Sequence, residues 1–135
     1  MKQIIYSFIL LTFLFIITYT SGCKDSVTAS DVDSRIIPDS NVSFSTDIQP
    51  VFNLKCTNAG CHEDAARAGG ISLTTCANTK SDPSVVFPGE PDNSRLIWAI
   101  EGIGNYPMPP AGYPPLTTNQ IKGIRTWVKE GAECN

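Results

Sequence analysis

The sequence has few of the residues from which most protein sites are built. Its 135 residues contain one histidine, and one methionine besides the first residue. The ten lysines and arginines never stand side by side, and the formal net charge is −3. A nucleic-acid site needs clustered positive charge, so we expect no nucleic-acid partner. No catalytic base, nucleophile or open coordination site is evident, and we therefore expect a non-enzymatic protein.

Long apolar runs are equally scarce, and the one that exists lies at the start, at residues 4–19. Sixteen residues are short for a membrane-spanning helix, which needs about 20, but suit the core of a signal peptide. The following Thr-Ser-Gly before Cys23 resembles the lipobox of bacterial lipoproteins. We therefore expect residues 1–22 to be a cleaved leader and Cys23 to carry lipid. The alternatives are an uncleaved anchor and ordinary cleavage, and each of the three puts the domain outside the cytoplasm.

The domain organisation follows from composition. Residues 23–42 are mainly polar with scattered valine and isoleucine, which predicts a flexible tether. Residues 43–135 then form a single domain, rich in loops because the chain holds ten prolines and ten glycines. A core this small usually needs help from a metal, a cofactor or disulfides.

Helical spacing of apolar residues appears in three segments: residues 45–55, 92–102 and 117–131. Ser45 or Thr46 can cap the first helix, which should run into Cys56. The last is the clearest, because Thr117 and Gln120 form a capping box. Its predicted buried stripe consists of Ile121, Ile124, Trp127 and Val128, and Gly131 ends it.

The residues that carry chemistry gather at 56–62, Cys-Thr-Asn-Ala-Gly-Cys-His. A cysteine pair that ends in Cys-His is the attachment pattern of c-type haem, although the usual gap between the cysteines is two residues and here it is four. Two thiols can form thioether bonds with the two vinyl groups of a porphyrin. The imidazole of His62 can then ligate the iron as the proximal ligand.

Three other interpretations of Cys56, Cys61 and His62 stay open from this stretch. The two thiols could form a small disulfide beside a surface histidine. They could form a zinc site with His62, completed by Cys76 or Cys134, since zinc accepts sulfur and imidazole ligands. They could also be buried and inert.

Met108 stands between prolines, in residues 106–110 (Tyr-Pro-Met-Pro-Pro). Pro109 biases Met108 away from the helical region, and Pro107 fixes its own φ angle. A stiff, extended loop presents a thioether at small entropic cost, which suits a distal iron ligand opposite His62. The alternative is a methionine that fills a gap in the core.

The five cysteines now divide without remainder. Cys23 takes lipid, and Cys56 and Cys61 take haem. The two that remain, Cys76 and Cys134, are expected to form a disulfide in an oxidising compartment. Such a bridge is worth about 4 kcal/mol by the loop-entropy argument.

Several motifs together resemble small bacterial cytochrome c domains of the kind found in planctomycete and Bacteroidetes-like proteins. They are residues 47–52, 56–62, 69–73 (Gly-Gly-Ile-Ser-Leu), 88–96 (Pro-Gly-Glu-Pro-Asp-Asn-Ser-Arg-Leu), 108–110 (Met-Pro-Pro) and 124–132. The resemblance implies an all-α cytochrome c fold of three to five short helices around one haem. It also implies that Cys56 and Cys61 are the thioether positions, that His62 is the proximal ligand and that Met108 is the distal ligand.

The sequence thus predicts a monohaem cytochrome c, exported to the periplasm or cell surface and anchored to the outer membrane. It would carry one electron between redox partner proteins at the membrane, in an oligomeric state that the sequence does not reveal. Two alternatives remain. One is an exported binding domain stapled by zinc or disulfides, and the other is a haem enzyme or sensor in which Met108 leaves the iron.

Overall fold

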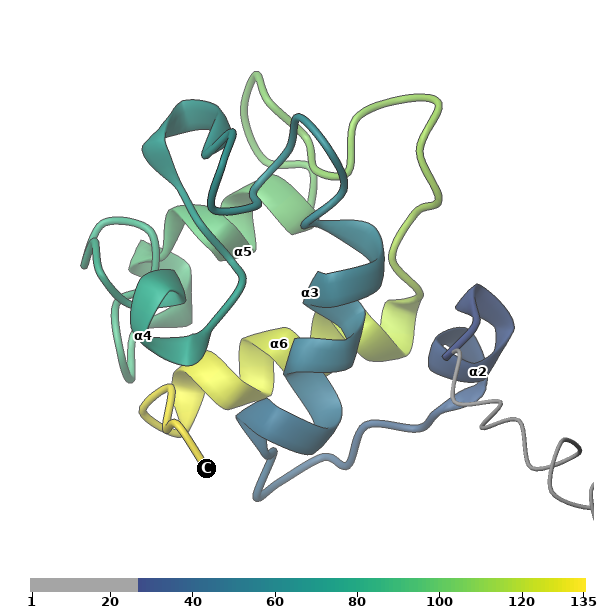
Figure 1. The fold of residues 1–135 in the computed structure, drawn as a ribbon. Coiled ribbons are helices and arrows are strands. Elements are labelled where there is room, and N and C mark those ends of the chain that lie inside the picture. The colour runs from purple at the N-terminus through teal and green to yellow at the C-terminus, as the bar shows by residue number, and fades with distance from the viewer. Residues whose placement is uncertain (1–26) are drawn as a thin grey trace, which may run out of the picture.

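The computed structural model describes residues 27–135, which form short helices joined by long loops (Figure 1). The α-helices of this part are α2 (Ala29–Ser34), α3 (Gln49–Lys55), α4 (Cys76–Thr79), α5 (Arg95–Ile100) and α6 (Thr118–Lys129). A π-helical turn, η1 (Phe44–Ile48), leads into α3, and the 3₁₀ turns are η2 (Ala68–Gly70) and η3 (Pro91–Asn93). Residues 27–135 contain no strand, so the expected all-α, loop-rich class is confirmed.

The predicted leader, residues 1–22, and the predicted lipid site, Cys23, lie outside the described residues. Within residues 27–135, no helix has the length and apolar content that crossing a bilayer requires.

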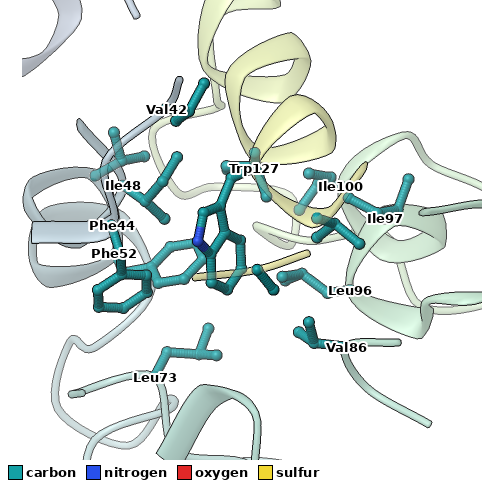
Figure 2. Close-up of a cluster of buried hydrophobic side chains, with 14 of the residues drawn as sticks. Val42, Phe44, Ile48, Phe52, Leu73, Val86, Leu96, Ile97, Ile100 and Trp127 are labelled. Carbon is teal, nitrogen blue, oxygen red and sulfur yellow. The ribbon is translucent and has the colours of Figure 1, made fainter. Parts of the chain in front are cut away.

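The core is built around Trp127 of α6, whose side chain is 1% exposed (Figure 2). Its ring lies 5.2 Å from that of Phe44, which in turn lies 6.1 Å from that of Phe52 on α3. Ile97 and Ile100 of α5 pack on the other side of the indole. The indole N–H donates to the carbonyl oxygen of Glu133 at 2.9 Å, so this deeply buried polar group is satisfied.

Helix α6 begins as its sequence predicts. The hydroxyl of Thr117 accepts from the backbone N–H of Gln120, and the side chain of Gln120 accepts from the backbone N–H of Thr117. In the predicted stripe Ile121 is only half-buried, whereas the other three residues are buried. Helix α3 differs at its start. Ser43, two residues before the expected cap, caps the turn η1 that precedes α3.

The prediction of a flexible tether over residues 23–42 is wrong for the part that the structure describes. Residues 28–42, which we call the strap, pack onto the domain and bury Val32, Ile37 and Val42. The side-chain amide of Asn119 on α6 bonds both backbone groups of Ile37, at 2.8 and 3.1 Å. The buried residues are five apart, which matches neither helix nor strand periodicity, so the pattern did not reveal them.

Gly123 of α6 explains how the strap approaches so closely. A Cβ atom at this position would lie 2.5 Å from Cγ2 of Ile37 and 2.9 Å from its Cβ. A glycine inside a helix normally weakens it by about 1 kcal/mol relative to alanine. Here it makes room for the strap.

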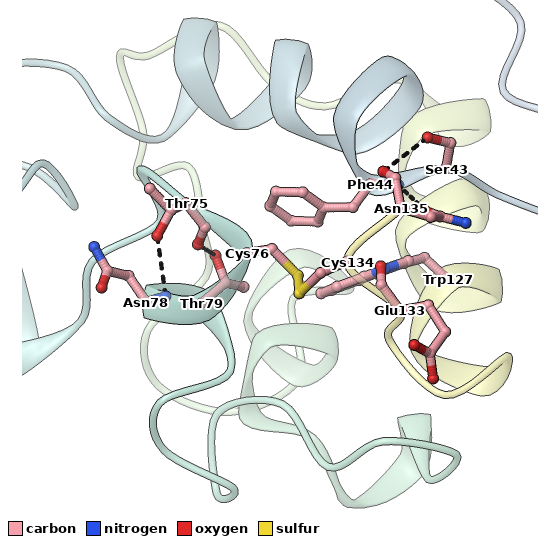
Figure 3. The surroundings of a disulfide bond; sticks show 10 residues. All are labelled: Ser43, Phe44, Thr75, Cys76, Asn78, Thr79, Trp127, Glu133, Cys134 and Asn135. Atoms are coloured by element: carbon pink, nitrogen blue, oxygen red, sulfur yellow. Dashed lines mark hydrogen bonds between the residues drawn. A yellow bond between two sulfur atoms is a disulfide. The ribbon is translucent and has the colours of Figure 1, made fainter.

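Cys76 at the start of α4 and Cys134 beyond α6 form a disulfide, with their Cα atoms 5.6 Å apart (Figure 3). The pair that the cysteine count predicts is thus at bonding distance. Nearby, the backbone N–H of Phe44 donates to the side-chain oxygen of Asn135 at 2.8 Å. The disulfide and this bond tie the segment after α6 to α4 and to η1.

Candidate functional site

Beside the core, the described part of the chain encloses a cavity of about 780 Å³. Its walls come from the end of α3, the segment after it, α5 and the loop of residues 101–116. This volume lies within the range of about 300–1,000 Å³ typical of sites for small molecules and cofactors. Much of the lining is aliphatic, from Ile71, Leu73, Val85, Leu96, Ile100 and Leu116. The structure also brings all four candidate residues to this one cavity: Cys56, Cys61, His62 and Met108.

The cysteine motif reaches the cavity because α3 ends directly at Cys56. The four intervening residues form a turn, in which Gly60 has a φ of +82°. The backbone N–H of Cys61 donates to the backbone carbonyl of Asn58 at 2.8 Å. The backbone N–H of His62 donates to the carbonyl of Cys56 at 3.0 Å. The longer gap between the cysteines is therefore absorbed by a closed turn, and both cysteines still line the same cavity.

Both thiols of the motif are free. Burial raises the pKa of Cys56 to about 12, and the nearby Cys61 adds to this while Lys55 opposes it. The Cys56 thiol is therefore protonated at neutral pH. A zinc site would need this thiol as a thiolate, together with further ligands.

The zinc interpretation also loses its remaining ligands. Cys76 and Cys134 are bonded to each other and cannot complete a zinc site. Within the described part of the chain, no three His, Cys, Asp or Glu side chains gather in a way that could hold a metal ion. The disulfide between Cys56 and Cys61 that the sequence left open is not formed either, since both thiols are free.

His62 is half-buried, and its ring is oriented by the backbone. Its Nδ1 lies 3.4 Å from the carbonyl oxygen of Ile71. A carbonyl can only accept, so a hydrogen bond here requires the proton on Nδ1, which leaves Nε2 as the nitrogen that could bind a metal. Such a hydrogen bond is the usual way in which a ligating histidine is held in one tautomer.

The segment that supplies this carbonyl is itself fixed. The backbone N–H of Leu73 donates to the carbonyl of His62 at 2.9 Å. The carboxylate of Asp64 accepts from the hydroxyl of Ser72 at 2.7 Å. This bond is the main reason why the pKa of Asp64 lies below its usual value. The loop after His62 is thereby closed on itself around the histidine.

Met108 lies within residues 101–116, a loop without regular helix that follows α5 in the sequence. Its backbone N–H donates to the carbonyl of Ala99 at 2.8 Å, which ties the middle of the loop to α5. The Met108–Pro109 peptide bond is cis. The side chain is half-buried and lines the cavity.

Two features of the cavity were not predicted as parts of the site. The first is a group of aromatic residues along its lining: Trp98, Tyr106 and Tyr113. The second is Lys55, which is buried and also lines the cavity. The sequence held a signal for Lys55, because it follows Ile48 and Phe52 at helical spacing and so shares their buried face.

Residues 59–112 match the family model for planctomycete cytochrome C. This match to planctomycete cytochrome C supports a small bacterial cytochrome c-type domain, as the resemblance of the motifs predicted. The matched stretch begins after Cys56 and contains Cys61, His62 and Met108. No curated protein and no solved structure matches the chain.

The residues of the cavity fit the cofactor that the cytochrome c match implies. A haem attached through thioethers requires two free thiols, one imidazole with an available nitrogen and an apolar cavity of suitable size. Cys56, Cys61 and His62 meet the first two requirements, and the aliphatic lining meets the third. Met108 would offer a thioether, which is a further group that suits iron.

Proposed function

We propose that this protein is a monohaem c-type cytochrome that carries one electron. The observation that supports the proposal most is the convergence of two free thiols, the only histidine and Met108 on one apolar cavity. In this proposal Cys56 and Cys61 hold haem c covalently. His62 and Met108 would hold its iron.

Haem, when bound, supplies an iron that takes up and releases one electron. The chain's own residues set the conditions for this. Ile71 orients His62 through its carbonyl, and the aliphatic side chains keep water from the cavity. An apolar surrounding disfavours additional charge, and a thioether ligand such as that of Met108 favours the reduced metal.

A carrier is a better interpretation than an enzyme because both axial positions would be filled by side chains. A haem enzyme or sensor needs an open position for its substrate or gas. Met108 therefore decides between the two classes, and its substitution is described among the predictions below.

We further propose that the protein is exported and held at the membrane by lipid on Cys23, where it would exchange electrons with redox proteins of the membrane. The support is the apolar run at residues 4–19, the lipobox-like stretch before Cys23 and the disulfide between Cys76 and Cys134. Disulfides persist in oxidising compartments outside the cytoplasm. Cys23→Ser should release the protein from membranes, and a wild-type protein that is found free of membranes would contradict the anchor.

Covalent attachment is the direct test of the proposed function. The protein should be produced in a host that matures cytochromes c, then denatured and extracted with acidified organic solvent. We expect the haem absorbance to remain with the polypeptide. In Cys56→Ser or Cys61→Ser the remaining thioether should still hold the haem on the polypeptide, and in the double variant the haem should become fully extractable. The matched control is the pair Cys76→Ser and Cys134→Ser, which should keep its haem. A colourless wild type would refute the proposal.

A further inference from the structure

Lys55 has an unusual position for a lysine, because its side chain is 1% exposed. It is the last residue of α3, directly before Cys56, and it lines the cavity. Its ammonium donates to the carbonyl oxygen of Pro115 at 2.7 Å and lies 2.5 Å from Oδ1 of Asp33. A positive charge is thus held inside the wall of the cavity.

Stability alone is a weak explanation for this charge. Burying an ion pair costs desolvation energy that its mutual attraction often fails to offset, and apolar replacements are frequently tolerated. The neighbours of Lys55 on the same face of α3 are apolar, among them Val51 and Phe52. An apolar residue at position 55 would continue this face. The lysine therefore calls for a reason connected with the cavity.

The two charges of the pair are screened unequally. Asp33 lies on α2 in the strap, and its side chain is 40% exposed. Lys55 is the main cause that lowers the pKa of Asp33, followed by the side-chain amide of Gln120. Because water screens an exposed charge more strongly than a buried one, the ammonium should dominate the field inside the cavity.

We propose that Lys55 raises the reduction potential of the cofactor bound in this cavity, and that Asp33 moderates this effect. The proposal rests on the proposed function. Reduction adds one negative charge to the haem, and a positive charge fixed in a low-dielectric wall stabilises the added electron. Lys55 is a positioning and tuning residue here and needs no contact with the iron.

The test compares the reduction potentials of Lys55→Met and Asp33→Asn. Lys55→Met removes the charge and keeps an unbranched apolar stem. We expect its equilibrium constant for one-electron reduction to fall about tenfold, a shift of about 59 mV to lower potential. Asp33→Asn keeps an oxygen acceptor for Lys55 and Gln120 and removes only the negative charge. We expect it to shift the potential in the opposite direction, by a smaller amount.

The matched control is the pair of Lys122 and Asp39, which are 61% and 76% exposed. Lys122→Met and Asp39→Asn make the same chemical changes at an exposed pair that does not line the cavity, and should leave the potential unchanged. Unfolding by urea, followed by circular dichroism, serves as an independent measurement. It shows whether the loss of the bond to Pro115 merely loosens the fold.

The outcomes separate this inference from the proposed function. Covalent haem with unshifted potentials in Lys55→Met and Asp33→Asn would overturn the role of Lys55 and leave the cytochrome intact. Potentials that fall in both variants, in step with lowered stability, would also overturn it, because a loosened fold explains them. A chain that binds no haem would overturn both proposals. Opposite shifts, with the far-red band of iron–methionine ligation retained in each variant, would support the tuning role.

Discussion

The two walls of the cavity differ in how the chain holds them. The wall that carries Cys56 is the end of α3, backed by Phe52 and Trp127 and fixed further by the strap. The wall that carries Met108 is the loop of residues 101–116, which has no regular helix and is mostly exposed. A few hydrogen bonds join this loop to the rest of the domain, such as the one from the backbone N–H of Met108 to the carbonyl oxygen of Ala99.

This difference separates two tasks. The proposed attachment points, Cys56 and Cys61, lie at and directly after the wall that folds through the chain's own core. The proposed second ligand, Met108, lies on a wall that depends on few contacts besides the group that would fill the cavity. Apart from the charged pair of Lys55 and Asp33, we therefore expect changes behind the first wall to alter mainly stability, and changes in the second wall to alter mainly the chemistry of the iron.

The largest effect on stability should come from removing the disulfide. Replacing Cys76 and Cys134 by serine opens a link between residues 58 positions apart. The free energy of unfolding should fall by about 4 kcal/mol, because the unfolded chain regains the freedom that the bridge had removed. Urea unfolding measures this directly. Reduction of the wild type by dithiothreitol should have the same effect and should add nothing in the double variant.

A smaller loss should follow Gly123→Ala. The added methyl group collides with Ile37, and we expect a net cost of about 1–2 kcal/mol even though alanine favours the helix. Unfolding measurements on the double variant with Ile37→Ala provide the control, because most of the collision is then gone. If Gly123→Ala stabilises the wild type, the strap does not pack as described.

Met108→Ala should change stability by only about 1 kcal/mol or less, since the side chain is half-buried on a loop. Its effect should appear instead in the haem. We expect a lower reduction potential, loss of the weak far-red band and rapid binding of carbon monoxide. Pro114→Ala, at an exposed position of the same loop that does not line the cavity, is the matched control and should behave like the wild type. A wild type that already binds carbon monoxide rapidly would favour a haem enzyme or sensor.

The smallest effect that we expect is a loss of stability at acid pH, which arises from two carboxylates in the strap. The pKa of Asp31 is lowered by the hydroxyl of Thr28, and that of Asp33 by Lys55. A carboxylate with a lowered pKa stabilises the fold above its unfolded value of 3.8, and this contribution is lost as the pH falls through the folded pKa. Stability measured by urea should therefore decline below about pH 4. The decline should be shallower in the double variant Asp31→Asn/Asp33→Asn than in the single control variant Asp39→Asn.

Local signals in the sequence were sufficient for helices α3, α5 and α6 and for naming the candidate residues of the site, but not for α2 or α4. The capping box at Thr117 and the spacing within α6 depend on near neighbours, and they appear as expected. The motif at Cys56 and the proline-flanked Met108 were recognisable for the same reason. Among features that depend on distant residues, the cysteine count predicted the disulfide between Cys76 and Cys134, but the others were missed. The strap, the close contact at Gly123 and the buried charge of Lys55 each need a partner more than 20 residues away.

The docked strap also sets how far the cavity could stand from a membrane. If lipid on Cys23 anchors the chain, a free tether up to residue 42 would allow a reach of about 65 Å. Because the fold already begins at Thr28, only five residue steps remain, or about 17 Å of extended chain. The carrier would then be confined to a thin layer above the bilayer. A partner would have to present its own redox group within that layer, since the protein could not swing out to meet it.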